Sequence, residues 1–261
     1  MKIIIFFLIV SSNLYSQSKP DNRFNGFEGT MVVYDLKSNS STIFNQKRAA
    51  TRFSPFSTYK IPNSIIALET KVIENVDQII KWDKNKYPQE NWWPKTWQGE
   101  HNLRSAIKYS VVPAYRHLAG LIGKERMQRY LNLFDYGNKD LSSAIDNFWL
   151  NGSLKISALE QVEFLKKFYQ DQLKISPRTI MLVKSILIRE QTENYKLSAK
   201  TGAGNIDKDK DIALGWYVGY VERENNVYFF ALNIEGQGFN EILKPRIEIT
   251  KSILKELGII E

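Results

Sequence analysis

The sequence predicts a mixed α/β (α+β) fold: an antiparallel sheet built from both ends of the chain and flanked by helices, with a mostly helical second subdomain at roughly residues 65–190. Three observations predict it. Runs rich in β-branched and aromatic residues occur near the start of the chain and again after residue 195. The segment between them has helical apolar spacing. The 261 residues suit one large domain or two closely packed ones.

Residues 1–18 have the pattern of a secretory signal peptide. Lys2 precedes an apolar run, 3–10, which is followed by a small polar stretch, 11–18. The run is too short to span a bilayer, which takes about 20 residues. We therefore expect residues 19–261 to form one exported domain, secreted or periplasmic, without stable membrane association.

The first elements of the mature chain are strands. Residues 29–36 and 41–45, with a turn between them, predict a β-hairpin. A helix is expected at 57–70, with Pro62 in its first turns, where proline costs least. Residues 82–98 contain four of the six Trp, so we expect an irregular segment that either walls a cleft or packs two subdomains together.

Helices are predicted through the middle of the chain. Residues 101–134 are expected to be helical, with Pro113 at the first position of one helix. Ser157 and Glu160 form a capping box that opens a helix to about residue 172, and Ser176 caps another to about Glu190. Two apolar stripes support the first region: Leu118, Leu121 and Ile122, and Met127, Tyr130, Leu131 and Phe134.

Strand patterns return after Tyr195, at 197–201, 212–223 and 227–234. A last helix is expected from about residue 246 to Leu257, with Gly258 ending it. Its apolar face holds Ile249, Ile253 and Leu257.

Composition narrows the function classes. The formal charge of +8 is scattered among Glu and Asp without a long basic run, so we expect no nucleic-acid partner, only some attraction for anionic small molecules. The chain has no Cys and two His, which predicts neither a disulfide framework nor a metal-ligand set.

The stretch Phe56-Ser57-Thr58-Tyr59-Lys60 has the residue types of a covalent nucleophile and its base. In a helix, a three-residue step puts Ser57 and Lys60 on one face. A serine hydroxyl needs a base to take its proton, and lysine serves only where burial disfavours its ammonium form. The pattern alone is weak, because three further copies exist: Ser16/Lys19, Ser105/Lys108 and Ser252/Lys255.

Two motifs downstream select the Ser57 copy. Ser110-Val111-Val112 follows it, and Lys200-Thr201-Gly202 follows in turn, on a strand that we expect beside Ser57. Each motif alone could be a helix cap or a turn. In this order they form a set of the Ser-x-x-Lys and Lys-Thr-Gly type found in β-lactamases and penicillin-binding proteins.

The sequence resembles the class D, oxacillinase-type, serine β-lactamases. The resemblance also rests on Tyr136-Gly137-Asn138, on Phe148-Trp149-Leu150 with Gly152-Ser153-Leu154, and on Trp216-Tyr217-Val218-Gly219. It implies a β-lactamase/transpeptidase-like fold and penicillin-type β-lactam antibiotics as substrates. Two positions depart from the pattern. Tyr59 stands where most members have Phe and related membrane-anchored sensors often have Tyr, and Ala203 stands where a bulkier aromatic residue is common.

The resemblance further implies residue roles. Ser57 would be acylated by the β-lactam carbonyl. Lys60 would take up CO2 to become N6-carboxylysine, the general base of both half-reactions, with no other cofactor. Ser110 would relay a proton to the lactam nitrogen, and Trp149 would donate its indole N–H to the carbamate. The other implied residues are Ser57 and Ala203, whose backbone amides form the oxyanion hole; Lys200, Thr201, Gly202 and Arg246, which bind substrate; and Val112 and Leu150, which shield the carbamate.

Three functions share this nucleophile: a hydrolase that turns over, a β-lactam sensor that stays acylated, and a peptidoglycan transpeptidase or carboxypeptidase. The signal pattern without transmembrane helices argues against the sensor. The Tyr136-Gly137-Asn138 and Phe148-Trp149-Leu150 stretches argue against the transpeptidase. We therefore expect a hydrolase; a homodimer stays open.

Overall fold

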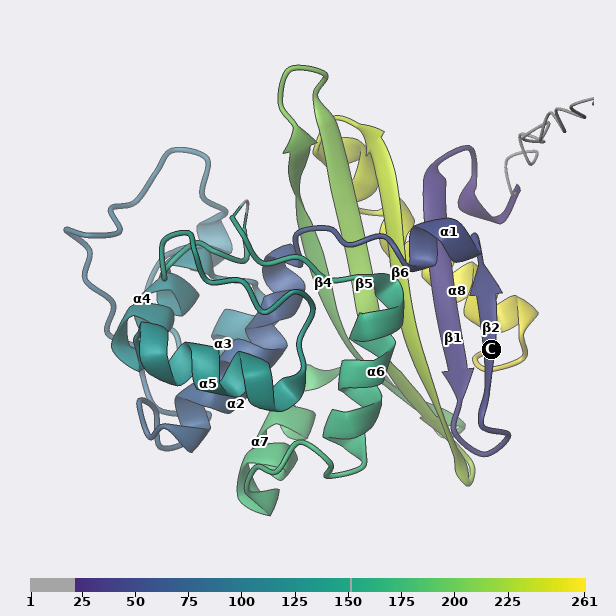
Figure 1. The fold of residues 1–261 in the computed structure, drawn as a ribbon, viewed down its shortest axis with the longest axis horizontal. Helices are drawn as coiled ribbons and strands as arrows, with labels where there is room; N and C mark the ends of the chain where they lie inside the picture. Colours follow the sequence, from purple (N-terminus) through teal and green to yellow (C-terminus); the bar gives the residue numbers. More distant parts are fainter. Residues whose placement is uncertain (1–21, 151) are drawn as a thin grey trace, which may run out of the picture.

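The computed structural model describes residues 22–150 and 152–261. Its centre is a six-stranded antiparallel sheet with the strand order β2-β1-β6-β5-β4-β3 (Figure 1). The predicted fold class is confirmed, since strands from both ends of the chain meet where β1 pairs with β6. The strands are β1 (Glu28–Asp35), β2 (Ser40–Phe44), β3 (Ile188–Gln191), β4 (Tyr195–Asp207), β5 (Ile212–Arg223) and β6 (Asn226–Gln237).

Helices cover both faces of this sheet (Figure 1). Their bounds are α1 (Gln46–Ala49), α2 (Lys60–Glu69), α3 (Leu103–Lys108), α4 (Val112–Ile122), α5 (Lys124–Phe134), α6 (Ala158–Tyr169), α7 (Pro177–Leu187) and α8 (Pro245–Glu256). Short 3-10 turns lie at η1 (Asn22–Phe24), η2 (Phe56–Tyr59), η3 (Lys95–Trp97) and η4 (Asn240–Ile242). The helices of the middle of the chain lie on one side of the sheet, and α8 lies on the other.

The alternation of side chains along each strand explains the two helical layers. Met31 and Val33 of β1 belong to the core beneath α8, whereas Val32 between them belongs to the larger core on the opposite face. Ile249 and Ile253 of α8 are fully buried in the first of these cores. The predicted capping box at the start of α6 is also present. Local patterning therefore sets which face each element buries.

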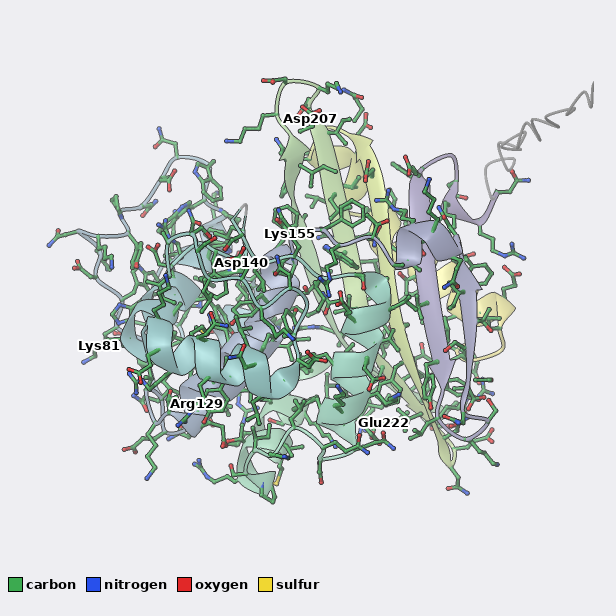
Figure 2. The ribbon with its side chains drawn as sticks, in the orientation of Figure 1. Lys81, Arg129, Asp140, Lys155, Asp207 and Glu222 are labelled. Carbon is green, nitrogen blue, oxygen red and sulfur yellow. The ribbon has the colours of Figure 1, made fainter. Side chains whose placement is uncertain are left out.

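The β4–β5 hairpin projects beyond its neighbours, with Asp207 near its tip and Glu222 toward the opposite end of β5 (Figure 2). Lys155, just before α6, lies between the helices and the sheet (Figure 2). Its Nζ donates to Ser54 Oγ at 2.8 Å, which ties the segment entering α6 to the segment that leads into η2.

Several predicted boundaries are wrong. The helix expected to reach Glu190 ends at Leu187, and the next four residues form the edge strand β3. The sequence Ile-Arg-Glu-Gln has no strand pattern, so its pairing with β4 is a tertiary effect. The strand expected at 197–201 extends over Tyr195–Asp207, because β5 pairs along its whole length. Pro113 is the second residue of α4 rather than its first.

Two apolar assignments are also wrong. Leu121 is 50% exposed, because Leu118 and Ile122 occupy the inward side of α4 and Leu121 falls beside them. Leu257, which follows the end of α8, is 36% exposed. The predicted signal peptide lies outside the described residues. Within the described ranges, no helix has the length and apolar character needed to span a membrane. The division into a helical subdomain at about 65–190 stays a prediction.

Candidate active site

Ser57 lies in the 3-10 turn η2, which leads directly into α2. The chain that leads into this turn is tied to the segment before α6. Phe53 and Ile156 exchange two backbone hydrogen bonds, of 2.9 and 2.8 Å, and the amide of Phe56 donates to the carbonyl of Trp149 at 2.9 Å. These bonds fix the position of Ser57 before α2 begins.

The turn of Ser57 rests against strand β4. Phe56 has a left-handed backbone, with φ of 47°, which is strained for a bulky residue. Its ring fits only because residue 204 is glycine, since a Cβ there would lie 2.0 Å from a ring carbon. A Cβ on Gly202 would lie 2.9 Å from the carbonyl oxygen of Pro55. The Lys-Thr-Gly strand and the nucleophile turn are thus in direct contact.

Lys60 is the partner of Ser57. Its Nζ lies 2.8 Å from Ser57 Oγ, and its side chain is fully buried. The ring of Tyr115 faces the amine with its centroid 5.3 Å away. Burial lowers the pKa of Lys60 from its usual value to about 7, because an ammonium ion loses its hydration there. At neutral pH a large fraction of this amine is therefore uncharged and able to accept a proton.

Burying this lysine costs stability, so Lys60→Met should be a stabilising substitution. In CO2-free buffer at about pH 7 we expect the free energy of unfolding to rise by on the order of 3–5 kcal/mol, at about 1.4 kcal/mol for each pKa unit. In the unfolded chain, the lysine has a pKa of about 10.4 and is protonated below that pH. Raising the pH from 7 toward about 10.4 therefore raises the free energy of unfolding of the wild type, and its difference from Lys60→Met shrinks. Urea unfolding of both proteins at several pH values measures it. A difference independent of pH would contradict the depressed pKa.

Ser110 and Lys200 form a second hydroxyl–amine pair. Lys200 Nζ donates to Ser110 Oγ at 2.9 Å and to the carbonyl of Thr201 at 2.8 Å. Ser110 has a left-handed backbone, with φ of 60°, in the tight connection between α3 and α4. Burial lowers the pKa of Lys200 well below its usual range, and the charges of Lys60, Arg189 and Arg246 lower it further. Burial thus favours the neutral amine form of both lysines of the site.

Trp149 is fully buried beneath the nucleophile turn and stacks on Tyr59, with ring centroids 5.6 Å apart and an interplanar angle of 27°. Its indole Nε1 is buried and has no hydrogen-bond partner. A buried donor normally has a partner, so an unpaired indole N–H marks a place where an acceptor group fits.

Arg246, at the second position of α8, reaches across β5 toward β4. It is 8% exposed, and its Nη1 donates to the carbonyl of Gly202 at 2.8 Å. Burial lowers its pKa to about 10, so it remains charged at neutral pH. No carboxylate within the described ranges makes an ion pair with Arg246, Lys200 or Lys60, which leaves this part of the site positively charged.

These groups open onto one cleft of about 790 Å³ between the sheet and the helices. Eight of the sequence-predicted site residues line it: Ser57, Ser110, Val112, Leu150, Thr201, Gly202, Ala203 and Arg246. Lys60, Lys200 and Trp149 lie beneath, each in contact with a residue of the cleft wall. The structure thus brings all eleven together. One rim is aromatic, with Trp92, Trp93 and Trp97 in mutual edge-to-face contact.

Two neighbours of the site were not predicted from the sequence. Tyr115 covers the Lys60 amine, and Arg189 contributes to the low pKa of Lys200. Neither lies in a recognisable motif, and Arg189 was assigned to a helix. In the described parts of the chain, no cluster of three His, Asp or Glu side chains is arranged to hold a metal ion.

A serine paired with a buried lysine lies beside a second pair, Ser110 and Lys200, whose lysine belongs to the Lys-Thr-Gly strand; this is the set of residue types found in serine acyl-transfer sites. The chain matches the family model of the penicillin binding protein transpeptidase domain over residues 11–256. Beta-lactamase OXA-48 of Klebsiella pneumoniae is 41% identical over 233 residues, which cover 89% of this chain and 84% of that protein. Beta-lactamase OXA-10 of Pseudomonas aeruginosa is 40% identical and is covered to 85%.

Solved structures of class D β-lactamases have the same fold as this chain. The class D β-lactamase FUS-1 (OXA-85) of Fusobacterium nucleatum subsp. polymorphum superimposes with a TM-score of 0.84 at 39% identity, covering 92% of this chain and 96% of that one. The chain therefore belongs to the transpeptidase-domain family and, within it, to the class D β-lactamases, serine hydrolases of the β-lactam amide. The methicillin resistance mecR1 protein of Staphylococcus aureus is 35% identical, but this chain spans only 39% of its length.

Proposed function

We propose that this enzyme opens the amide bond of penicillin-type β-lactams by forming an acyl-enzyme on Ser57, which water then hydrolyses. The observation that carries the proposal is the 2.8 Å contact between Ser57 Oγ and the fully buried Nζ of Lys60. A hydroxyl becomes a nucleophile when a neutral base lies within hydrogen-bond reach. A pKa of about 7 makes the Lys60 amine such a base at the pH of the cell exterior.

The proton route follows from the two pairs. The Ser57 proton leaves toward the Lys60 side chain as Oγ bonds to the lactam carbonyl carbon. When the carbon–nitrogen bond breaks, Ser110 donates its hydroxyl proton to the lactam nitrogen and receives in exchange the proton that Ser57 released; the neutral amine of Lys200, 2.9 Å from Ser110 Oγ, can carry that proton. The product of this half-reaction is an ester on Ser57 with the ring opened. Water then completes the hydrolysis with the Lys60 side again taking a proton.

Lys60 fits the carboxylated form that the class implies. Only a neutral amine adds CO2, and burial keeps this amine largely neutral. The unpaired indole Nε1 of Trp149 supplies a donor for the added carboxylate oxygen, while Val112 and Leu150 are partly buried apolar residues at the cleft. When bound, the carbamate would supply an anionic carboxylate oxygen as the proton acceptor beside Ser57.

The charges of the cleft fit the rest of the substrate. A penicillin carries a carboxylate; Arg246 presents a charged guanidinium, and Lys200 and Thr201 present amine and hydroxyl donors. Arginine suits a carboxylate because its two N–H groups can bind both oxygens. The backbone amides of Ser57 and Ala203, two residues that line the cleft, would stabilise the oxyanion, at about 3–4 kcal/mol for one donor.

Turnover of a chromogenic cephalosporin with and without added bicarbonate tests the proposal. We expect many turnovers per enzyme, and recovery by bicarbonate after acid treatment. Trp149→Phe keeps an aromatic ring at this buried position but removes the N–H, so we expect kcat to fall about 10- to 100-fold, with more bicarbonate needed for half recovery. One turnover followed by a stable adduct would instead favour the sensor function, and unchanged bicarbonate dependence in Trp149→Phe would remove that residue's role.

We also propose that residues 1–18 direct export and are removed. The apolar run and the relationship to β-lactamases support this. The mass of the protein recovered from the cell exterior or periplasm measures it: loss of the first 16 to 18 residues is the expected result.

A further inference from the structure

Arg189 occupies an unusual position in the fold. It lies in the edge strand β3, where Ile188 pairs with Ser198 but Glu190 pairs with Leu197. The register therefore shifts at Arg189, which has no partner of its own across the ladder. Such bulges re-aim one side chain and are frequent at sheet edges and beside active sites.

The re-aimed side chain points into the protein and contacts both halves of the site. Arg189 Nε donates to the carbonyl of Ala199 at 2.9 Å, and Ala199 directly precedes Lys200. Its Nη2 makes a longer contact of 3.4 Å with the carbonyl of Ile107, in the last turn of α3, just before Ser110. One guanidinium thus joins the strand that carries Lys200 to the helix that leads to Ser110. The end of a helix also favours a positive charge.

The charge of Arg189 is not neutralised. No carboxylate in residues 22–150 or 152–261 makes an ion pair with it, and the neighbouring carboxylate, Glu190, instead bonds Lys251 and Tyr195. Burial lowers the pKa of Arg189, but an arginine keeps its charge at every working pH. An unpaired, partly buried cation is costly, which calls for a functional explanation.

The surroundings of Lys200 supply a functional explanation for the unpaired charge of Arg189. The ionisable groups that influence Lys200 are Lys60 on α2, Arg189 on β3 and Arg246 on α8, of which the two arginines are charged at neutral pH. Tyr115 and Tyr217 lie near Arg189, and burial raises the pKa of both phenols, so they stay neutral. A fixed neighbouring cation disfavours a second positive charge, a known way to obtain a neutral, reactive lysine.

We propose that Arg189 is a positioning residue for the Ser110–Lys200 pair: it fixes the distance between the two by joining Ala199 to Ile107, and it holds a permanent positive charge near the Lys200 amine. This inference rests on the proposed role of that pair. Arg189 would make two contributions, a structural link between Ala199 and Ile107 and a positive charge, and different substitutions can remove them separately. Arg189→Lys keeps the charge but loses the planar fork, whereas Arg189→Met and Arg189→Gln lose the charge.

The direct test is NMR titration of Lys200 in protein labelled with 13C at the lysine ε-carbon, with the signal assigned by its loss in Lys200→Arg. In Arg189→Gln and Arg189→Met we expect the pKa of Lys200 to rise by about half a unit or more, because a like charge has been removed. In Arg189→Lys it should stay within a few tenths of the wild-type value, while the acylation rate falls several-fold. Arg223→Met, at the far end of β5, is the matched control and should change neither.

The outcomes are distinguishable. An unchanged Lys200 pKa in the uncharged variants overturns the inference, even if those variants are less active, because loss of packing alone does not move that value selectively. Should Arg189→Met fail to fold, Arg189→Gln decides the question, since its amide can still donate to Ala199. Failure of the proposed role of the pair has a different signature: Ser110→Ala and Lys200→Ala would then acylate at the wild-type rate.

Discussion

Ser57→Ala is expected to lower turnover of a chromogenic cephalosporin by about 10⁴-fold or more and to abolish the covalent adduct seen by mass spectrometry. The reason is positional. Ser57 is the cleft hydroxyl that lies 2.8 Å from the Lys60 amine, and Gly202 and Gly204 leave the room in which its turn is held. An alanine there keeps the fold and removes the only atom that forms the ester bond.

Two further variants make this result specific. Ser252 and Lys255 have the same spacing but are exposed on α8, so Ser252→Ala should leave turnover unchanged. Ser110 is the rival nucleophile, because it also contacts a buried lysine. We expect Ser110→Ala to form the adduct more slowly, on the peptide that contains Ser57. An adduct that persists in Ser57→Ala, or one that maps to Ser110, would contradict the assignment.

The second large effect is expected for Lys60→Ala. Removing the base leaves no neutral acceptor beside Ser57, so we expect kcat to fall by about 10² to 10⁴-fold. Deacylation should suffer more than acylation, because the strained β-lactam ring is the more reactive of the two acyl donors. The enzyme should therefore accumulate as a stoichiometric acyl adduct that stopped-flow and mass measurements detect. Added bicarbonate should not restore turnover in this variant, in contrast to the wild type. Wild-type turnover in Lys60→Ala would remove lysine as the base.

The sequence identifies the residues of the site that lie in short motifs, and the fold brings these residues together at one cleft. Ser57, Ser110 and Lys200 each sit in a short motif, and antiparallel pairing of strands from both ends of the chain brings β4 to the turn of Ser57. The burial of Lys60 was expected because a lysine can act as a base only where its ammonium form is disfavoured. The structure adds the ring of Tyr115 as the group that covers the amine.

What the sequence did not predict depends on contacts between distant segments. The strand β3 has a local pattern that favours helix, and only its pairing with β4 makes it a strand. Arg189 enters the site through a bulge in that same strand, and no spacing rule could place it there. Leu121 shows the same limit, because its exposure depends on which side of α4 meets the core. Sequence motifs thus identify the candidate catalytic residues, whereas contacts between distant segments decide which residues outside any motif surround them.

The proposed mechanism requires Lys60 to be a neutral, buried amine able to take up carbon dioxide beside Ser57. The most direct measurement is 13C NMR of the protein in 13C-bicarbonate at about pH 7.5, compared with Lys60→Met and with Ser57→Ala. We predict a carbamate resonance in the wild type and in Ser57→Ala that is absent from Lys60→Met and that disappears as the pH falls below the Lys60 pKa of about 7. A wild-type spectrum without that resonance, or one in which it survives in Lys60→Met, would contradict the account.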